Sequence, residues 1–74
     1  MEVDRSLVDP RYAILFDRLD TFVEKYTLHN NRAPRRLYVP DIVMQHLYQV
    51  HKGEPGATIK YRGVIIASDE DFSY

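Results

Sequence analysis

The 74-residue chain contains no cysteine and only three glycines. The absence of cysteine excludes a disulfide framework, a thiolate zinc site and a thiol nucleophile. The chain also lacks a run of about 18 uninterrupted apolar residues, which a membrane span needs. Its N-terminus, MEVDRSLVD, is mixed in charge and does not have the basic-then-apolar order of a signal peptide. We therefore expect a soluble cytoplasmic protein that does not interact with membranes.

The polar residues do not form a catalytic or metal-binding pattern. His46 and His51 are five residues apart, which is the wrong spacing for two ligands on one helix face, and His29 lies elsewhere in the chain. No nucleophile elbow and no glycine-rich phosphate loop is present. So few residues also leave little room for a pocket of catalytic size. We predict no enzyme activity, no metal site and no cofactor.

The composition nevertheless indicates a folded protein. Hydrophobic residues make up 45% of the chain, and six of its residues are tyrosine. A chain of this length buries only about 60% of the surface that it exposes when unfolded, so its core must be small. We expect residues 1–74 to form a single small domain.

The most strongly patterned stretch covers residues 9–29 and predicts a long helix. Its apolar residues follow the spacing of one helix face, with steps of three and one: Tyr12, Leu15, Phe16, Leu19, Phe22, Val23 and Tyr26. Asp9 and Pro10 form a start signal, because aspartate caps free amides and proline is well tolerated in the first helical turn. Asn30 and Asn31 are candidate stops, since asparagine tolerates the left-handed conformation that ends helices.

Shorter elements are predicted on either side of this helix. Residues 1–8 are expected to form a loose arm, with Leu7 and Val8 packing back on the helix start. Residues 36–39 read as a strand that stops at Pro40, and a second helix opens at 40–41. Its apolar face includes Val43, Met44, Leu47 and Val50, and Gly53 is expected to cap its C-terminus.

The remaining sequence is rich in β-favouring residues from 58 to 67. A tight hairpin at Arg62 and Gly63 is the favoured interpretation, and one long strand with a glycine bulge is the alternative. Residues 69–74 form an acidic and aromatic tail. The resulting order is α-β-α-β-β, which predicts a two-layer α+β fold in which both helices pack on a small two- to three-stranded sheet.

Charge is distributed unevenly along the chain. Residues 1–30 carry a balance of −2, residues 31–65 carry +4, and the last nine carry −3. The middle region is therefore the candidate for anion or nucleic-acid contact, through Arg32, Arg35, Arg36, Tyr38, Lys60 and Arg62. The alternative is that these arginines pair with the acidic side of the long helix. The net charge of −1 favours that alternative.

The long helix is also a candidate docking surface. Four of its apolar residues are aromatic, which is more than a small sheet can readily cover, and these residues are Tyr12, Phe16, Phe22 and Tyr26. Surplus aromatic surface in a small domain is typical of a dimer or a docking face. The alternative is that the helix simply supplies the core.

Two segments resemble proteins of bacterial viruses. The segment PRRLYVPDIVMQHLYQ and the later IKYRGVIIASDEDF resemble small uncharacterised proteins of tailed phages and prophages. They are also similar to a late segment of phage major capsid proteins, although Arg62-Gly63-Val64-Ile65 lacks the proline common there. The resemblance covers residues 34–72. It implies a phage or mobile-element origin and a place in the bacterial host cell, and it carries over no site residues.

Two functions remain open. The first is a non-catalytic protein-interaction module, an accessory factor that self-associates or binds a larger host or phage protein. Its helix aromatics would provide apolar contact, and its arginines would steer an acidic partner surface. The alternative is a small nucleic-acid-binding or transcription-regulating protein that uses the arginine cluster.

Overall fold

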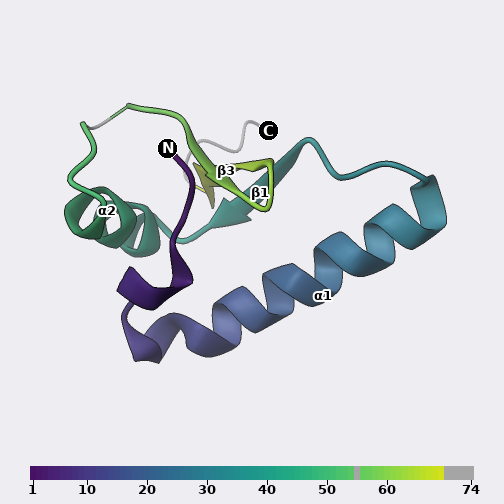
Figure 1. Ribbon diagram of the computed structural model, residues 1–74, viewed down its shortest axis with the longest axis horizontal. Helices are drawn as coiled ribbons and strands as arrows, with labels where there is room; N and C mark the ends of the chain where they lie inside the picture. The colour runs from purple at the N-terminus through teal and green to yellow at the C-terminus, as the bar shows by residue number, and fades with distance from the viewer. Residues whose placement is uncertain (55, 70–74) are drawn as a thin grey trace.

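The computed structural model describes residues 1–54 and 56–69, and Figure 1 shows their arrangement. Two main helices, α1 (Ala13–Asn30) and α2 (Asp41–Val50), accompany three strands, β1 (Arg36–Val39), β2 (Ile59–Tyr61) and β3 (Val64–Ser68). Two short 3-10 turns, η1 (Arg5–Leu7) and η2 (Pro10–Tyr12), precede α1. The α+β fold and the order α-β-α-β-β are confirmed. The predicted tail lies outside the described residues after Asp69. Within them, no helix is long and apolar enough to cross a bilayer.

The ends of α1 follow the predicted signals. The Asp9 side chain accepts a hydrogen bond from the Arg11 amide and starts the turn η2, which continues into α1. At the other end, Asn31 adopts a left-handed φ of 57°, and its amide donates to the Thr27 carbonyl. One side of α1 buries Phe16, Leu19 and Val23. The C-terminal half of α1 extends away from α2 and leads into the loop that returns to β1 (Figure 1).

The end of α2 differs from the prediction by one residue. Lys52, not Gly53, has the left-handed φ of 52°. The Gly53 amide donates to the Tyr48 carbonyl and the Lys52 amide to the Gln49 carbonyl, which is the Schellman arrangement with Lys52 at its left-handed position. Gly53 lies against the N-terminal residue, since a Cβ there would be 2.6 Å from the Met1 Cε.

The sheet is mixed, with the strand order β1-β3-β2. β3 lies in the centre, parallel to β1 and antiparallel to β2. A two-residue turn joins β2 and β3, and both of its residues have positive φ, 53° at Arg62 and 79° at Gly63. This is the pattern of a type I′ turn, which matches the twist of antiparallel strands. The hairpin prediction is confirmed.

The core lies on one face of the sheet. Buried and more accessible residues alternate along all three strands, as expected for a sheet covered on one side. The buried face packs with both helices in one cluster, in which Phe16, Val39, Val43, Leu47, Ile59 and Val64 have the most deeply buried side chains. The other face carries Arg36, Tyr38, Lys60, Ile65 and Ala67.

The N-terminal residues are held in place where a loose arm was expected. Val3 donates its amide to the Lys60 carbonyl and Lys60 donates its amide to the Met1 carbonyl, both at 2.8 Å. This short parallel pairing covers the outer edge of β2. Farther along, the Asp4 amide donates to His51 Nε2 and the Asp9 amide to His46 Nε2, both at 2.9 Å. The two histidines of the α2 region therefore tie the arm to the domain.

Candidate arginine and aromatic docking groove

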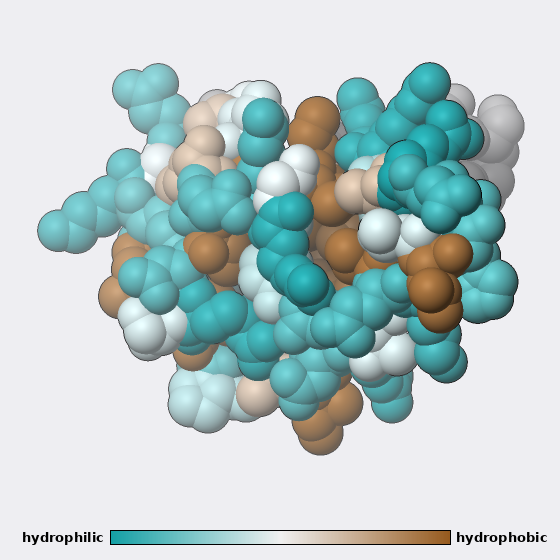
Figure 2. Space-filling model, turned by 45° about the vertical axis from the view of Figure 1, so that its right-hand side comes forward, coloured by the Kyte–Doolittle hydropathy of each residue, from teal (hydrophilic) through white to brown (hydrophobic). Residues whose placement is uncertain are grey.

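An open groove lies between α1 and the segment that enters β1. It consists of two adjoining hollows of about 480 and 330 Å³ that share Phe22, Arg36 and Tyr38. We call it the arginine groove and define it by its lining residues, which are Arg18, Leu19, Phe22, Tyr26, Arg32, Ala33, Pro34, Arg35, Arg36, Leu37 and Tyr38. In Figure 2, which brings the side of the C-terminal half of α1 forward, hydrophobic surface lies among hydrophilic side chains.

The aromatic wall of the groove comes from α1. Phe22 and Tyr26 are four residues apart and therefore project from the same side of the helix, with their ring centroids 5.9 Å apart. Phe22 is 49% exposed, although it follows the buried Leu19 by one turn. Tyr38 from β1 is 40% exposed and contributes a third aromatic side chain. The groove thus presents apolar surface to solvent at the edge of the sheet.

The cationic wall comes mainly from the loop that follows α1. Asn31 ends the helix in a left-handed conformation, and the chain then turns back toward β1 through residues 32–35. Pro34 is buried and fixes this loop, while the flanking Arg32 and Arg35 are exposed. Arg18 adds a fourth guanidinium to Arg32, Arg35 and Arg36, and it lies one turn before Phe22 on α1.

The groove is unneutralised in the part of the chain that the structure describes. There, no hydrogen bond or ion pair engages the side chains of Arg18, Arg32, Arg35 and Arg36. None of the described lining residues is acidic. Four guanidinium groups beside three aromatic rings make a surface that attracts anions and also offers apolar contact.

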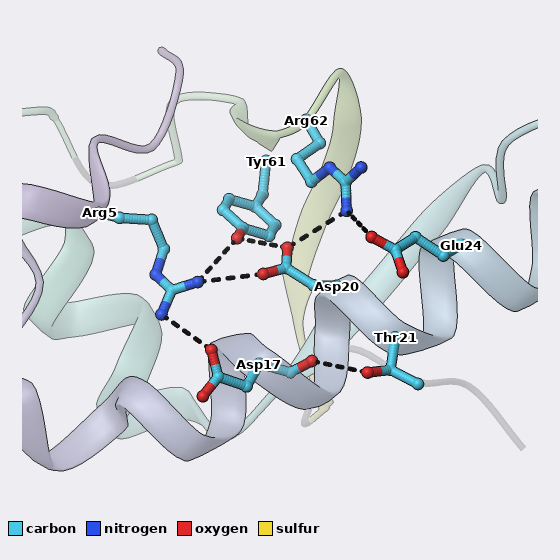
Figure 3. A network of polar contacts seen from close by, with 7 residues as sticks. All are labelled: Arg5, Asp17, Asp20, Thr21, Glu24, Tyr61 and Arg62. Carbon is cyan, nitrogen blue, oxygen red and sulfur yellow. Dashed lines mark hydrogen bonds and ion pairs between the residues drawn. The ribbon is translucent and has the colours of Figure 1, made fainter.

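The acidic side of α1 is neutralised by other arginines, as Figure 3 shows. Arg5 contacts Asp17 at 3.3 Å and Asp20 at 3.1 Å. Arg62 contacts Asp20 at 3.4 Å and Glu24 at 3.6 Å. The alternative prediction was that the arginines of the middle region pair with the acidic side of α1. It is correct for Arg62 and wrong for Arg32, Arg35 and Arg36.

Tyr61 connects this network to the core. Its hydroxyl donates to Asp20 Oδ1 at 2.6 Å and accepts from Arg5 Nη1 at 3.2 Å, while its ring meets Phe16 edge-on at 5.1 Å. Burial raises the pKa of the Tyr61 hydroxyl, and its hydrogen bond to Asp20 raises that pKa further. The same hydroxyl raises the pKa of the Arg5 guanidinium. These contacts stabilise the fold and lie outside the arginine groove.

The predicted anion-contact residues separate into three groups. Arg32, Arg35, Arg36 and Tyr38 come together in the groove. Lys60 lies on the accessible face of the sheet, in a row with Ile65 and Arg36, because Ile65 is the register partner of both. Arg62 belongs to the network on the acidic side of α1.

The four helix aromatics also separate. Phe22 and Tyr26 line the groove, as a docking role requires. Phe16 has no exposed surface, and Tyr12 packs partly buried against the core with its ring 5.2 Å from that of His46. Phe16 therefore cannot contact a partner while the chain is folded. The helix does supply the core, but only its first three turns do so.

The histidines and carboxylates form no metal site in the described residues. Among residues 1–54 and 56–69, no group of three or more histidine, aspartate or glutamate side chains is placed to hold a metal ion. His51 instead contacts the Leu47 carbonyl through Nδ1 at 3.0 Å and accepts from Asp4 through Nε2. This pattern requires the proton on Nδ1.

Sequence reasoning missed two contributors to the groove. Arg18 was not among the predicted contact residues, although its place four residues before Phe22 is a signal that the two share one side of the helix. Pro34 carried no functional expectation, yet it is the buried anchor of the arginine loop. Comparisons of the chain with protein-family models, curated proteins and solved structures found no match.

Proposed function

We propose that the chain is a non-catalytic protein-interaction module that binds an acidic segment of a larger phage or host protein in the arginine groove. The observation that supports the proposal is that four guanidinium groups, none of them in an ion pair within residues 1–54 and 56–69, lie beside the exposed Phe22 and Tyr38. Aromatic and arginine side chains are the residue types enriched at the energetic centres of protein interfaces. The phage partner rests on the resemblance of residues 34–72.

The groove favours a different protein over a second copy of this chain. In a symmetric dimer the same patch meets itself, so two grooves would bring their guanidinium groups face to face. Like charges brought together at an interface oppose binding. An acidic partner removes this repulsion and supplies carboxylates, which bind guanidinium groups in a bidentate manner.

The direct test is binding of a fluorescein-labelled peptide of about seven residues that alternates glutamate with leucine, followed by anisotropy across a salt series. The paired variants are R35A/R36A and R11A/K25A, which remove the same charge inside and outside the groove. We expect affinity to fall with salt and to fall about tenfold in R35A/R36A, while R11A/K25A stays within about twofold of the wild type. Equal loss in both variants would contradict the proposal, because it would show attraction to overall charge.

A second candidate function is contact with single-stranded nucleic acid. The observation that favours it is the row of Arg36, Ile65 and Lys60 on the accessible sheet face, next to Tyr38. Bases can stack on aromatic rings while cationic side chains contact phosphates. The chain pI of 6.3 is far from the basic values typical of such proteins. Oligothymidine in the same assay decides between the candidates, because tighter binding than the peptide would favour nucleic acid.

A further inference from the structure

The smaller hollow of the arginine groove has an apolar base and wall. Its volume is about 330 Å³, and Leu19, Phe22 and Leu37 contribute apolar side chains to its lining. Leu19 and Leu37 are 8% and 3% exposed, so they reach the hollow from the core, whereas Phe22 is 49% exposed and stands beside it. Ligand pockets range from about 300 to 1,000 Å³. A hollow at the lower end of that range suits one large side chain.

Arginines come to this hollow from both of the elements that border it. Arg18 belongs to α1, one turn before Phe22, and Arg36 belongs to β1. A guanidinium group packs on the face of an aromatic ring and also binds carboxylates. The chain already contains such a contact, since the Arg5 guanidinium lies 5.5 Å from the centroid of the Phe16 ring. An aromatic side chain in the hollow would gain contacts with arginine that leucine cannot make.

The larger hollow places cationic groups next to this apolar one. Arg36 lines both hollows, and Arg32 and Arg35 line the larger one. Carboxylates on the residues beside an inserted side chain would therefore meet guanidinium groups. An apolar pocket inside a polar rim is the arrangement found at the energetic centres of protein interfaces, where aromatic side chains are enriched.

We propose that the smaller hollow receives a single aromatic side chain of the partner protein, which acidic residues flank in the partner's sequence. This inference rests on the proposed function and adds the residue that anchors the acidic segment. The carboxylates attract the partner to the groove, and the aromatic side chain selects it among acidic sequences.

The test compares three fluorescein-labelled peptides of five residues with blocked ends. In each peptide four glutamates flank a central residue, which is phenylalanine, leucine or alanine, so the charge is the same. Anisotropy at low salt measures their binding to the full chain. We expect the phenylalanine peptide to bind most tightly, the leucine peptide about threefold more weakly, and the alanine peptide about tenfold or more weakly.

A variant of the chain locates the anchor. F22A removes one wall of the hollow, and the half-exposed position of Phe22 makes the change compatible with folding. We expect F22A to bind the phenylalanine and alanine peptides within about threefold of each other. L28A is the matched control, because Leu28 is 77% exposed on the same helix and does not line the groove. L28A should keep the full difference between the two peptides.

The outcomes separate this inference from the proposed function. Equal binding of the three peptides to the wild type would overturn the aromatic anchor, and so would a leucine peptide that binds at least as tightly as the phenylalanine peptide. A full difference that persists in F22A would place the anchor outside this hollow and overturn the inference as well. If neither these peptides nor the glutamate–leucine peptide of the direct test binds at low salt, the proposed function itself fails.

Discussion

The hydroxyl of Tyr61 donates a hydrogen bond of 2.6 Å to Asp20 Oδ1 and so links the β2–β3 hairpin to the acidic side of α1. Arg5 and Arg62 converge on the same carboxylate, from the N-terminal arm and from the hairpin turn. Three segments that are distant in the sequence thus meet at Asp20. Arg5 and Arg62 thus form the ion pairs of the α1 carboxylates, and the arginines of the groove are not needed for them.

Replacement of Tyr61 by phenylalanine tests this connection. Y61F keeps the ring against Phe16 but removes the hydrogen bond to Asp20, and we expect a loss of about 1 kcal/mol in the free energy of unfolding. The raised pKa of Tyr61 also makes the stability depend on pH, because the folded state holds the phenolic proton more tightly than the unfolded state.

Stability from this group is fully present below the unfolded pKa of about 10 and is lost as pH rises through the folded pKa. Urea unfolding at neutral pH and above pH 10 measures both effects. The wild type should lose more stability with rising pH than Y61F does. Identical pH profiles for the two proteins would contradict a role for this hydroxyl.

The end of α2 offers a stabilising substitution. Lys52 adopts a left-handed φ of 52°, which is unfavourable for a residue with a Cβ. K52G should relieve that strain and raise the free energy of unfolding by about 1 kcal/mol, with K52A as the control that removes only the long side chain. Thermal unfolding compares the three proteins. If K52A stabilises as much as K52G, the gain comes from the lysine side chain and not from the backbone.

The attachment of the N-terminal arm depends on histidine acceptors. H51A removes the nitrogen that accepts the Asp4 amide, so we expect faster hydrogen exchange at Asp4 and a loss of about 1 kcal/mol. H29A is the matched control, because the one polar contact of the His29 ring among the described residues is with the Lys25 carbonyl of its own helix. Exchange at Asp4 that stays the same in H51A would show that the strand pairing of residues 1–3 holds the arm without help.

Local signals in the sequence account for most of the fold. The helix start at Asp9, the stop at Asn31, the strand before Pro40 and the hairpin at Gly63 each depend on neighbouring residues, so they could be predicted. The attachment of the arm could not be predicted in this way, because the Asp4 amide and His51 are 47 residues apart. Such a contact exists only once α2 and the sheet are in place.

The groove was predictable in its parts but not as one site. Phe22 and Tyr26 were candidates for protein contact, and Arg32, Arg35 and Arg36 for anion contact, as two separate surfaces. They become one surface because the loop after Asn31 returns along the C-terminal half of α1. The helix pattern alone did not distinguish Phe16 from Phe22, since both lie on the apolar stripe and only their positions relative to the sheet decide which is buried.

The most direct test of the central claim is an NMR titration that maps where the glutamate–leucine peptide binds. The account predicts that amide shifts concentrate in residues 32–38 and around Phe22 and Tyr26, and that the signals of residues 17, 20 and 61 stay in place. Shifts that concentrate instead on the exposed side of α2, or that spread evenly over the cationic residues, would contradict a partner site in the arginine groove.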